Sequence, residues 1–402
     1  MQKFKLKNGM TVIYVQKPST SVAVEVLVKV GSNNENNQEL GISHFIEHMV
    51  FEATKKRGSS REVANEIEGI GGELNAYTSN ERTCYYAKVP KKYFDRALDV
   101  ISDILQNPLF RDEDIKKQRK IILKEVGLVT DEPRFHQWIL FGKTLFKKHP
   151  AKNPTYGTVR TVKSMTKKQI LDYYQKYYQP NNMVLSVVGE VKGLRQKLEN
   201  KFFLGKGQKI KEKIIKEPKQ KQKRVMKEKR KITNTYVVLG YPTVPRNNPD
   251  SYVLDVVDAI LGRGQSGWMF DTIRSQHGLA YEVGVQHVAE SDYGFFGVHL
   301  SIDKKKIDLV KKLIFEVFGK LKNISDEDLK EAKDYIEGNY LLENEETQKA
   351  ADNLVNWEQL TKAEDFSDYV KMIKKVNKAD IKKVMGKYFT KNYCLAIIEG
   401  QG

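Results

Sequence analysis

The sequence has only two cysteines in 402 residues, Cys84 and Cys394. Both lie in strand-like runs, and their spacing suggests neither a metal knuckle nor a disulfide framework. We therefore expect two buried free thiols in a reducing compartment.

Long apolar runs are also lacking. No run approaches the roughly 18 residues that a membrane-spanning helix needs. The first residues, MQKFKLKNGMTVIYV, contain neither a long apolar core nor the small-residue cleavage site of a signal peptide. We expect a cytoplasmic chain without membrane segments, whose length fits two domains of about 200 residues.

Acidic residues are fewer than basic ones, 51 against 69, which gives a net charge of +18. More than half of this excess lies in residues 205–231, which hold 13 Lys or Arg and three Glu. The segment contains no aromatic residue, whereas recognition of single-stranded nucleic acid combines basic and aromatic side chains. We predict a solvated linker here and no nucleic-acid partner. A nucleic-acid binder using this segment would lose affinity steeply with salt.

The two halves of the sequence resemble each other at a constant shift of 211 residues. MTKKQILDYYQKYYQPNNMVLSVVGE (165–190) matches VNKADIKKVMGKYFTKNYCLAIIEGQ (376–401), and ERTCYYAKV (81–89) falls on DYGFFGVHL (292–300). The repeat predicts an α+β fold of two homologous domains, each an antiparallel-rich sheet with helices packed on it, related by internal duplication. We place the domains at 1–207 and 231–402, with a basic linker at 208–230.

Residues 41–51, GISHFIEHMVF, have the apolar spacing of a helix. His44 and His48 are one turn apart and share a face, with Glu47 beside them. Two imidazoles so placed can bind one Zn²⁺, and a third protein ligand and a water would complete a catalytic tetrahedron. Glu47 can then act as the base for that water. The order His-x-x-Glu-His inverts the more familiar zinc-hydrolase pattern.

The alternative is that both histidines are ordinary core or surface residues. At the shift of 211, His44, Glu47 and His48 fall on Asp255, Asp258 and Ala259. The sister helix thus forms without an imidazole pair, so packing does not require one. Because Asp255 shows that this face tolerates polar residues anyway, the repeat supports a metal site only modestly.

Together these features resemble the inverzincin zinc metallopeptidases, the family of pitrilysin, insulin-degrading enzyme and mitochondrial processing peptidase. The sequence most resembles their short, two-domain bacterial members, and the resemblance covers nearly the whole chain. The matching segments are LKNGMTVIYV, GISHFIEHMVFEAT, GGELNAYTSNERTCYYAKVP, YYQPNNMVLSVVGEV and LGRGQSGWMFDTIRSQHGLAYEVG.

The resemblance implies a third zinc ligand at Glu125, 77 residues after His48. Glu125 lies in an expected amphipathic helix whose apolar positions are Ile115, Ile121, Ile122 and Val126. Without the resemblance, the residues do not distinguish Glu125 from Glu113, and either could be a solvent-facing carboxylate.

Gln118 stands where the family usually has a second glutamate, seven residues before the ligand. Positions seven apart differ by about 20° around a helix, so we expect Gln118 to face the site and hydrogen-bond a ligand histidine. Its amide lacks the charge that raises imidazole basicity. Weaker metal binding or a lower rate is therefore left open.

GELNAYTSN (72–80) matches the family's edge strand, along which a substrate adds as a further β-strand. The resemblance implies that Asn75 and Ala76 contact the substrate backbone; the alternative is a strand that merely leads into a turn. It also implies that Arg274 and Tyr281 reach the cleft from the second domain and stabilise the developing negative charge. A surface arginine and a core tyrosine are the alternative.

Two further patterns are interpreted as structural. Gly262, Gly264 and Gly267 spell the GxGxxG dinucleotide fingerprint, but helical spacing precedes them where the fingerprint needs a strand. We expect a glycine-rich turn and no nucleotide. The histidines without metal-site spacing are expected to be structural or solvated; they are His136, His149, His277, His287 and His299.

The sequence therefore predicts a zinc metalloendopeptidase that cleaves peptides or unfolded segments inside a dimer chamber, with Glu47 activating the zinc-bound water. Because one chain carries the expected ligands and the Arg/Tyr pair, a homodimer is the simplest expectation, with a heterodimer as the other. The alternative function is a non-catalytic or partner-dependent subunit of a heterodimeric processing peptidase. Loss of the ligands would mark such a subunit, and His44, Glu47, His48 and Glu125 are all present.

Overall fold

The computed structural model describes residues 1–203, 205, 207, 210 and 215–401, which divide into two compact units. The first unit comprises Met1–Leu128, Asn153–Lys213 and Leu342–Phe366. The second comprises Val129–Lys152, Ile214–Leu341 and Ser367–Gly402. Each unit is thus assembled from segments that are distant in the sequence.

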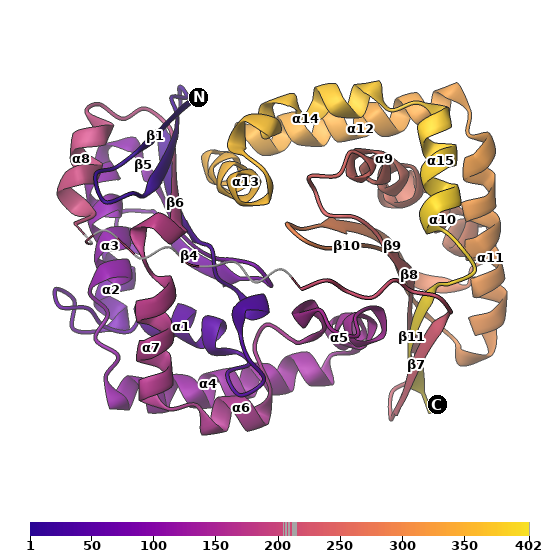
Figure 1. Ribbon diagram of the computed structural model, residues 1–402, viewed down its shortest axis with the longest axis horizontal. Coiled ribbons are helices and arrows are strands. Elements are labelled where there is room, and N and C mark those ends of the chain that lie inside the picture. Colours follow the sequence, from indigo (N-terminus) through magenta and orange to yellow (C-terminus); the bar gives the residue numbers. More distant parts are fainter. Residues whose placement is uncertain (204, 206, 208–209, 211–214, 402) are drawn as a thin grey trace. The chain divides into compact units, whose positions relative to one another are not determined.

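The first unit is built on a six-stranded sheet with the order β1-β2-β6-β3-β5-β4 (Figure 1). All neighbours are antiparallel except β2 and β6, which are parallel. The strands are β1 (Gln2–Lys5), β2 (Thr11–Val15), β3 (Ser21–Val28), β4 (Glu73–Thr78), β5 (Thr83–Pro90) and β6 (Met183–Val188). The helices of this part of the chain are α1 (Ile42–Val50), α2 (Ser60–Glu68), α3 (Phe94–Gln106), α4 (Asp112–Asp131), α6 (Val159–Ser164), α7 (Lys167–Tyr177) and α8 (Leu194–Lys201).

Strand β3 shows why this sheet forms a core on both faces. Its side chains alternate between the faces, and Val22, Val24, Val26 and Val28 join the main hydrophobic cluster with the helices. β-branched side chains suit such a pleated, packed surface. The intervening residues of β3 are buried as well, so the opposite face is also covered.

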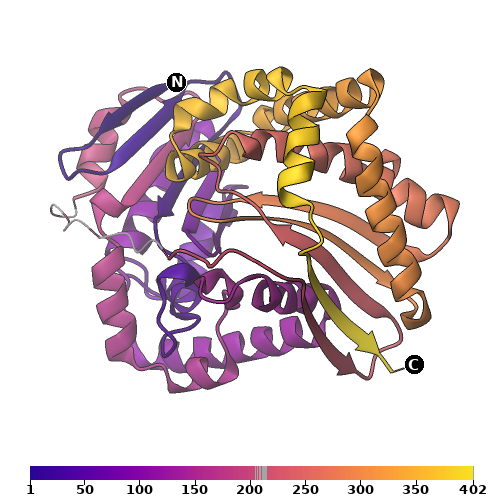
Figure 2. The same cartoon turned by 45° about the vertical axis from the view of Figure 1, so that its right-hand side comes forward.

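The second unit contains a five-stranded sheet with the order β7-β11-β8-β10-β9, whose strands run side by side in Figure 2. The strands are β7 (Arg224–Arg230), β8 (Thr235–Pro242), β9 (Ala280–Ala289), β10 (Gly294–Ile302) and β11 (Cys394–Gly400). The helices are α9 (Asp250–Gly262), α10 (Trp268–Phe270), a π-helical turn (Asp271–Gln276), α11 (Ile307–Lys320), α12 (Asp326–Glu345), α14 (Ala363–Lys375) and α15 (Lys378–Tyr388). Short 3₁₀ turns connect elements at Ser32–Asn34, Lys91–Tyr93, Pro150–Lys152, Pro180–Asn182, Gly264–Ser266, Lys304–Lys306 and Leu321–Asn323.

The two sheets confirm the internal duplication. In each, a parallel pair (β2 with β6, β7 with β11) is followed by three antiparallel neighbours. The shift of 211 also carries element starts onto element starts. Thr83 of β5 falls on Gly294 of β10, and Met183 of β6 falls on Cys394 of β11. The predicted α+β fold with two similar domains is therefore confirmed.

Each sheet is covered on one face by a helix from the other half of the chain. Helix α13 (Thr347–Leu360) packs on β3 and β6 of the first sheet. Helix α5 (Pro133–Leu145) packs on β11 and β8 of the second sheet. We call these two the exchanged helices. Because of them, the compact units differ from the sequence repeats expected at 1–207 and 231–402.

The predicted basic linker at 208–230 contains a strand that the charge pattern concealed. Residues 224–230 form β7, which pairs in parallel with β11 at the edge of the second sheet. Charged side chains suit an edge strand because they oppose pairing with other molecules. Residues 208–209 and 211–214 of that segment lie outside the described residues.

The expectation for the two cysteines is met. Cys84 and Cys394 are free and buried, as expected. Among the described residues, no helix combines the length and apolar character that crossing a bilayer requires.

Candidate metal centre

The candidate centre begins with α1, which presents the His-x-x-Glu-His residues. The helix buries Phe45, Ile46 and Met49 on one side and leaves His44, Glu47 and His48 half-buried on another. Its start is fixed by Glu35, whose carboxyl oxygens accept hydrogen bonds from the backbone N–H groups of Gly41 (2.7 Å) and Ser43 (2.9 Å). Carboxyl oxygens at this position accept hydrogen bonds from otherwise unpaired helix donors.

Helix α4 brings Glu125 to the two histidines. Oε2 of Glu125 lies 3.8 Å from Nε2 of His44 and 3.4 Å from Nε2 of His48. Ligand atoms around a tetrahedral zinc ion with bonds of about 2.0–2.1 Å are roughly 3.3 Å apart. Two imidazole nitrogens and a carboxylate oxygen at these separations fit zinc in both chemistry and spacing. Glu113, the competing glutamate, is 73% exposed and pairs with Arg111 instead.

Helix α4 itself is largely as expected. Ile115, Ile122 and Val126 are buried, whereas Ile121 is 37% exposed. The prediction of Ile121 as part of the apolar face was therefore wrong. The apolar face of α4 is narrower than the positions of the isoleucines suggested, because Ile121 lies about 100° from Ile122 around the helix.

Gln118 fixes the protonation pattern of His48. Its Nε2 donates to the carboxylate of Glu52, so its Oε1 faces Nδ1 of His48 at 3.0 Å. An amide oxygen only accepts, so Nδ1 of His48 donates to it, and Nε2 is the nitrogen that faces Glu125. Lys117 also donates to Glu52, at 2.8 Å, and holds that carboxylate in place. Gln118 is thus found where the sequence placed it, facing the site.

The surroundings of the His44 imidazole differ from those of His48. Burial lowers the pKa of His44 to about 3, and the neighbouring His48 adds to this effect. The imidazole is therefore neutral near pH 7, as a metal ligand must be. Within the described residues its Nδ1 has no hydrogen-bond partner.

Glu47 is held beside the histidines by the edge strand. The hydroxyl of Thr78, the last residue of β4, donates to Oε2 of Glu47. Burial raises the pKa of the Glu47 carboxyl, and the hydrogen bond from Thr78 and the proximity of His48 act in the opposite direction. Glu47 thus lies close to the donor set but outside it, which is the position a general base requires.

Strand β4 is an edge strand, as predicted, since it pairs only with β5 in the first sheet. Asn75 is exposed, and its side-chain oxygen accepts the backbone N–H of Ala76 at 2.8 Å. An edge strand with such a group can take up a further strand. The contact of Asn75 and Ala76 with substrate stays a prediction.

Arg274 and Tyr281 belong to the second unit, so their action at the candidate centre stays a prediction. Tyr281 is 76% exposed at the start of β9, which excludes the alternative of a core tyrosine. The guanidinium of Arg274 lies 5.1 Å from the centre of the Tyr281 ring and 4.9 Å from that of Phe270. These cation–π contacts keep the arginine and tyrosine together.

The structure supports the structural interpretation of the remaining motifs. Gly262 ends helix α9, and Gly264 and Gly267 follow that helix rather than a strand, so the dinucleotide fingerprint is incomplete. In the described part of the chain, the only groups of three or more candidate metal ligands are His44 with His48 and Glu125, and Glu25 with Cys84 and Asp352. The other histidines have contacts outside the candidate centre: His136 contacts Glu228, His149 contacts Asp292, His277 contacts the Thr272 carbonyl, His287 contacts Asp255 and His299 contacts Trp138.

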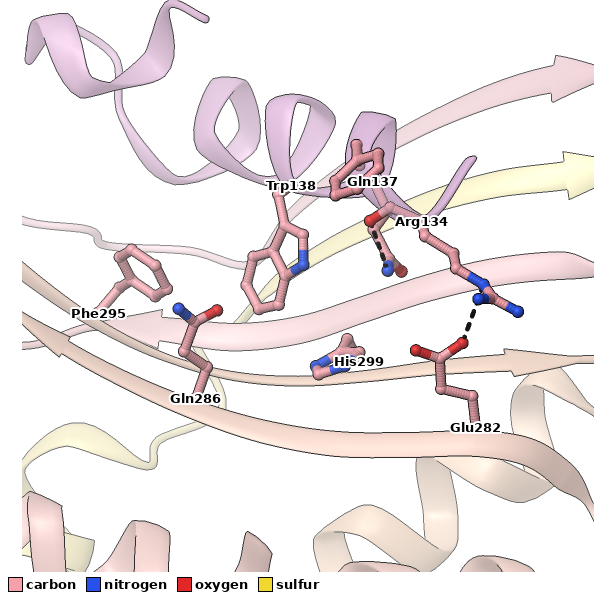
Figure 3. A pocket seen from close by; sticks show the side chains of 8 residues that line it. Arg134, Gln137, Trp138, Glu282, Gln286, Phe295 and His299 are labelled. Carbon is pink, nitrogen blue, oxygen red and sulfur yellow. Dashed lines mark hydrogen bonds and ion pairs between the residues drawn. The ribbon is translucent and has the colours of Figure 1, made fainter. Parts of the chain in front are cut away.

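A pocket of about 500 Å³ lies within the second unit, between α5 and the strands β9 and β10 (Figure 3). Arg134 and Glu282 form an ion pair of 3.2 Å there, and Trp138 and His299 face each other. A single imidazole and a single carboxylate do not make a three-ligand metal site. The residues that line it are Arg134, Phe135, Gln137, Trp138, Glu282, Gln286, Phe295 and His299.

Three residues of the centre were missed by the sequence analysis: Glu35, Glu52 and Thr78. Each acts through a tertiary contact that no spacing rule describes. Thr78 lies inside the quoted segment GELNAYTSN. The edge-strand prediction therefore included this residue but assigned it no function. Glu52 follows α1 directly, and its position one turn after His48 was the available signal.

Comparison with protein families gives two adjoining matches. Residues 11–159 match the model described as Insulinase (Peptidase family M16), and residues 164–336 match that of the Peptidase M16 inactive domain. The second match includes Asp255, Asp258 and Ala259, at the positions equivalent to the His-x-x-Glu-His residues.

Similar proteins are found over nearly the full length. The chain is 32% identical over 411 residues to an uncharacterized zinc protease of Rickettsia felis, covering 98% of this chain and 96% of that protein. It is 29% identical to the uncharacterized zinc protease YmxG of Bacillus subtilis, covering 100% and 99%. The crystal structure of a protease from Helicobacter pylori superposes with a TM-score of 0.93 over 99% of both chains at 24% identity, which shows a shared fold.

Proposed function

The chain belongs to the M16 (insulinase) peptidase family as a two-domain member of the bacterial zinc-protease type, and from this premise we propose that it is a zinc-dependent endopeptidase for peptides or unfolded segments. The observation that carries the proposal is the convergence of His44, His48 and Glu125, with Glu47 beside them. Zinc, when bound, supplies a Lewis acid that polarises the scissile carbonyl and acidifies water.

Glu47 moves the protons of the proposed reaction. Its carboxylate accepts a proton from the attacking water and then delivers it to the amide nitrogen of the leaving peptide. Thr78 keeps Oε2 oriented by its hydrogen bond, so Oε1 is the oxygen that we assign to proton transfer.

Strand β4 binds the substrate in this proposal. A peptide adds along its open edge through main-chain hydrogen bonds, which are largely independent of sequence. The N–H of Ala76 becomes a donor to the peptide when the Asn75 side chain turns away from it. Because Thr78 at the end of β4 contacts Glu47, the bound peptide lies next to the base.

Two parts of the proposal rest on the family resemblance. Arg274 and Tyr281 stabilise the negative charge that develops on the carbonyl oxygen. Two copies of the chain, or one copy and a related chain, enclose the substrate. Light scattering of the purified protein tests the dimer, and mixing with a related chain tests the heterodimer.

Metal removal tests the proposed activity. We expect a chelator to abolish cleavage of quenched fluorescent peptides and added zinc to restore it, because Glu47 alone does not activate water sufficiently. Zinc-saturated chelator is the control for direct inhibition. Cleavage that continues without metal would refute a zinc peptidase. Inactivity of the zinc-loaded chain would instead favour the partner-dependent subunit.

Replacing Gln118 with leucine should weaken zinc binding by about 10–100-fold, the usual effect of losing a hydrogen bond to a ligand histidine. Leucine removes the acceptor of the His48 Nδ1 proton, whereas Gln118→Glu keeps an acceptor and adds charge. Competition with a chelating dye measures both affinities. An unchanged affinity in Gln118→Leu would show that the hydrogen bond does not orient His48 for metal.

A further inference from the structure

A second cluster of metal-ligating side chains lies in the first unit, away from α1. Glu25 is in the middle of β3, Cys84 is on the neighbouring β5, and Asp352 is on the exchanged helix α13. One ligand atom from each residue lies within 4.8 Å of the other two. The three residues therefore join two strands to the helix that covers them.

Glu25 is a carboxyl group in an unusual place. It is fully buried, and within the described residues neither of its oxygens has a hydrogen-bond partner. Burial of an unpaired carboxylate is costly. Burial raises the pKa of Glu25 well above its usual value, and the nearby Asp352 raises it further. Packing alone does not explain why the carboxyl group of Glu25 is buried here.

Asp352 is oriented as a ligand would be. The Tyr77 hydroxyl donates to its Oδ1, and the Asn356 amide donates to its Oδ2 at 2.9 Å. Each oxygen retains a lone pair, and carboxylate ligands of metals are commonly held by such outer hydrogen bonds. Tyr77 also belongs to β4, so the cluster adjoins the edge strand.

The donor types favour zinc among the common divalent ions. Zinc accepts thiolate and carboxylate ligands together in tetrahedral sites, whereas magnesium and calcium require oxygen ligands alone. An ion with two positive charges would also offset the two carboxylates. We propose that Glu25, Cys84 and Asp352 form a second zinc site, which fastens α13 to the first sheet.

Binding at this site exchanges protons for the ion. Burial raises the pKa of the Cys84 thiol, so this group holds a proton in the metal-free chain. The ion displaces that proton, which leaves to solvent. The affinity of this site therefore rises with pH.

Cobalt titration of the metal-free, full-length protein tests the site, because a thiolate bonded to Co²⁺ gives a near-ultraviolet charge-transfer band. The ligands His44, His48 and Glu125 contain no sulfur, so the band reports the second site alone. We expect two equivalents and the band in the wild type. The double variant His44→Ala/His48→Ala should keep one equivalent and the band.

Variants of the cluster complete the test. Cys84→Ala should lose the band and one equivalent, whereas Cys394→Ala, at the other buried cysteine, should keep both. Glu25→Gln preserves the shape of the side chain and the thiol, yet should weaken binding at least tenfold. A single equivalent without a band in the wild type would overturn the proposal, leaving two carboxyls that share a proton. A band that survives in Cys84→Ala would overturn it too. Neither result depends on peptidase activity.

Discussion

Replacing Glu47 with glutamine lowers the rate of peptide cleavage by about 10²–10⁴-fold, the contribution expected of a general base. Glutamine has nearly the same shape and still accepts the Thr78 hydrogen bond, but it takes no proton from water. Because Glu47 is outside the set of His44, His48 and Glu125, zinc content should stay unchanged. Peptide cleavage and metal analysis of the same preparation measure the two effects.

Glu68→Gln is the matched control, because this residue is exposed at the end of α2. It should cleave peptides like the wild type. Full activity in zinc-loaded Glu47→Gln would place the base elsewhere and contradict the proposed mechanism. Loss of zinc together with activity would show that Glu47 supports the metal rather than the proton transfer.

The second large effect concerns stability. Asp255→Asn should lower the free energy of unfolding by about 3–5 kcal/mol, as expected when one partner of a buried ion pair is removed. Asp255 accepts hydrogen bonds from Arg246 (2.6 Å), His287 (2.7 Å) and the Tyr369 hydroxyl (3.1 Å). The substitution leaves the Arg246 guanidinium without its carboxylate partner. Urea unfolding followed by circular dichroism measures the change.

The effect should depend on pH in a defined direction. Burial alone would raise the pKa of Asp255, but Arg246 and His287 outweigh it and hold the pKa below its usual range. A carboxyl group whose pKa is lowered in the folded state stabilises the protein at pH values above its unfolded-state pKa of about 3.9. This stabilisation is lost as the pH falls through the folded-state pKa. The difference between wild type and Asp255→Asn should therefore be largest near pH 7 and shrink below about pH 4.

Asp334→Asn is the control for charge alone, because Asp334 is exposed on α12 and pairs with Lys330 one turn away. It should unfold like the wild type. An Asp255→Asn variant as stable as this control would show that the Arg246–Asp255–His287 cluster contributes nothing net. Such neutrality is known for buried ion pairs replaced as a whole, but not for those with one partner removed.

The sequence was most informative where chemistry and local geometry coincide. One helical turn separates His44 and His48, so their shared face follows from the helix period alone. The repeat at a shift of 211 predicted two similar α+β domains, because matched apolar patterns require matched packing. Glu125, by contrast, was chosen through resemblance, since Glu113 had an equal claim on the basis of periodicity.

The features that the sequence did not predict depend on contacts between residues that are far apart in the chain. β7 was missed because its hydrogen bonds come from β11, at the other end of the second half, while its own composition is that of a charged loop. Glu52 and Thr78 act by reaching side chains on other elements. Local patterns carry no information about such partners, and only the packed structure brings them together.

The exchanged helices have a consequence for how the chain is made. A ribosome that has completed residue 207 has already produced His44, His48 and Glu125, but not α13, which covers the face of the first sheet that contains Glu25. That face stays open until Leu360 has emerged, so the sheet of the first half is closed only when residues 347–360 have been made. A nascent or truncated chain that ends before Thr347 carries every catalytic candidate of the first half, yet it exposes a hydrophobic sheet face to chaperones and proteases. Loss of the final helices thus exposes the first sheet to quality control while leaving His44, His48 and Glu125 in the chain.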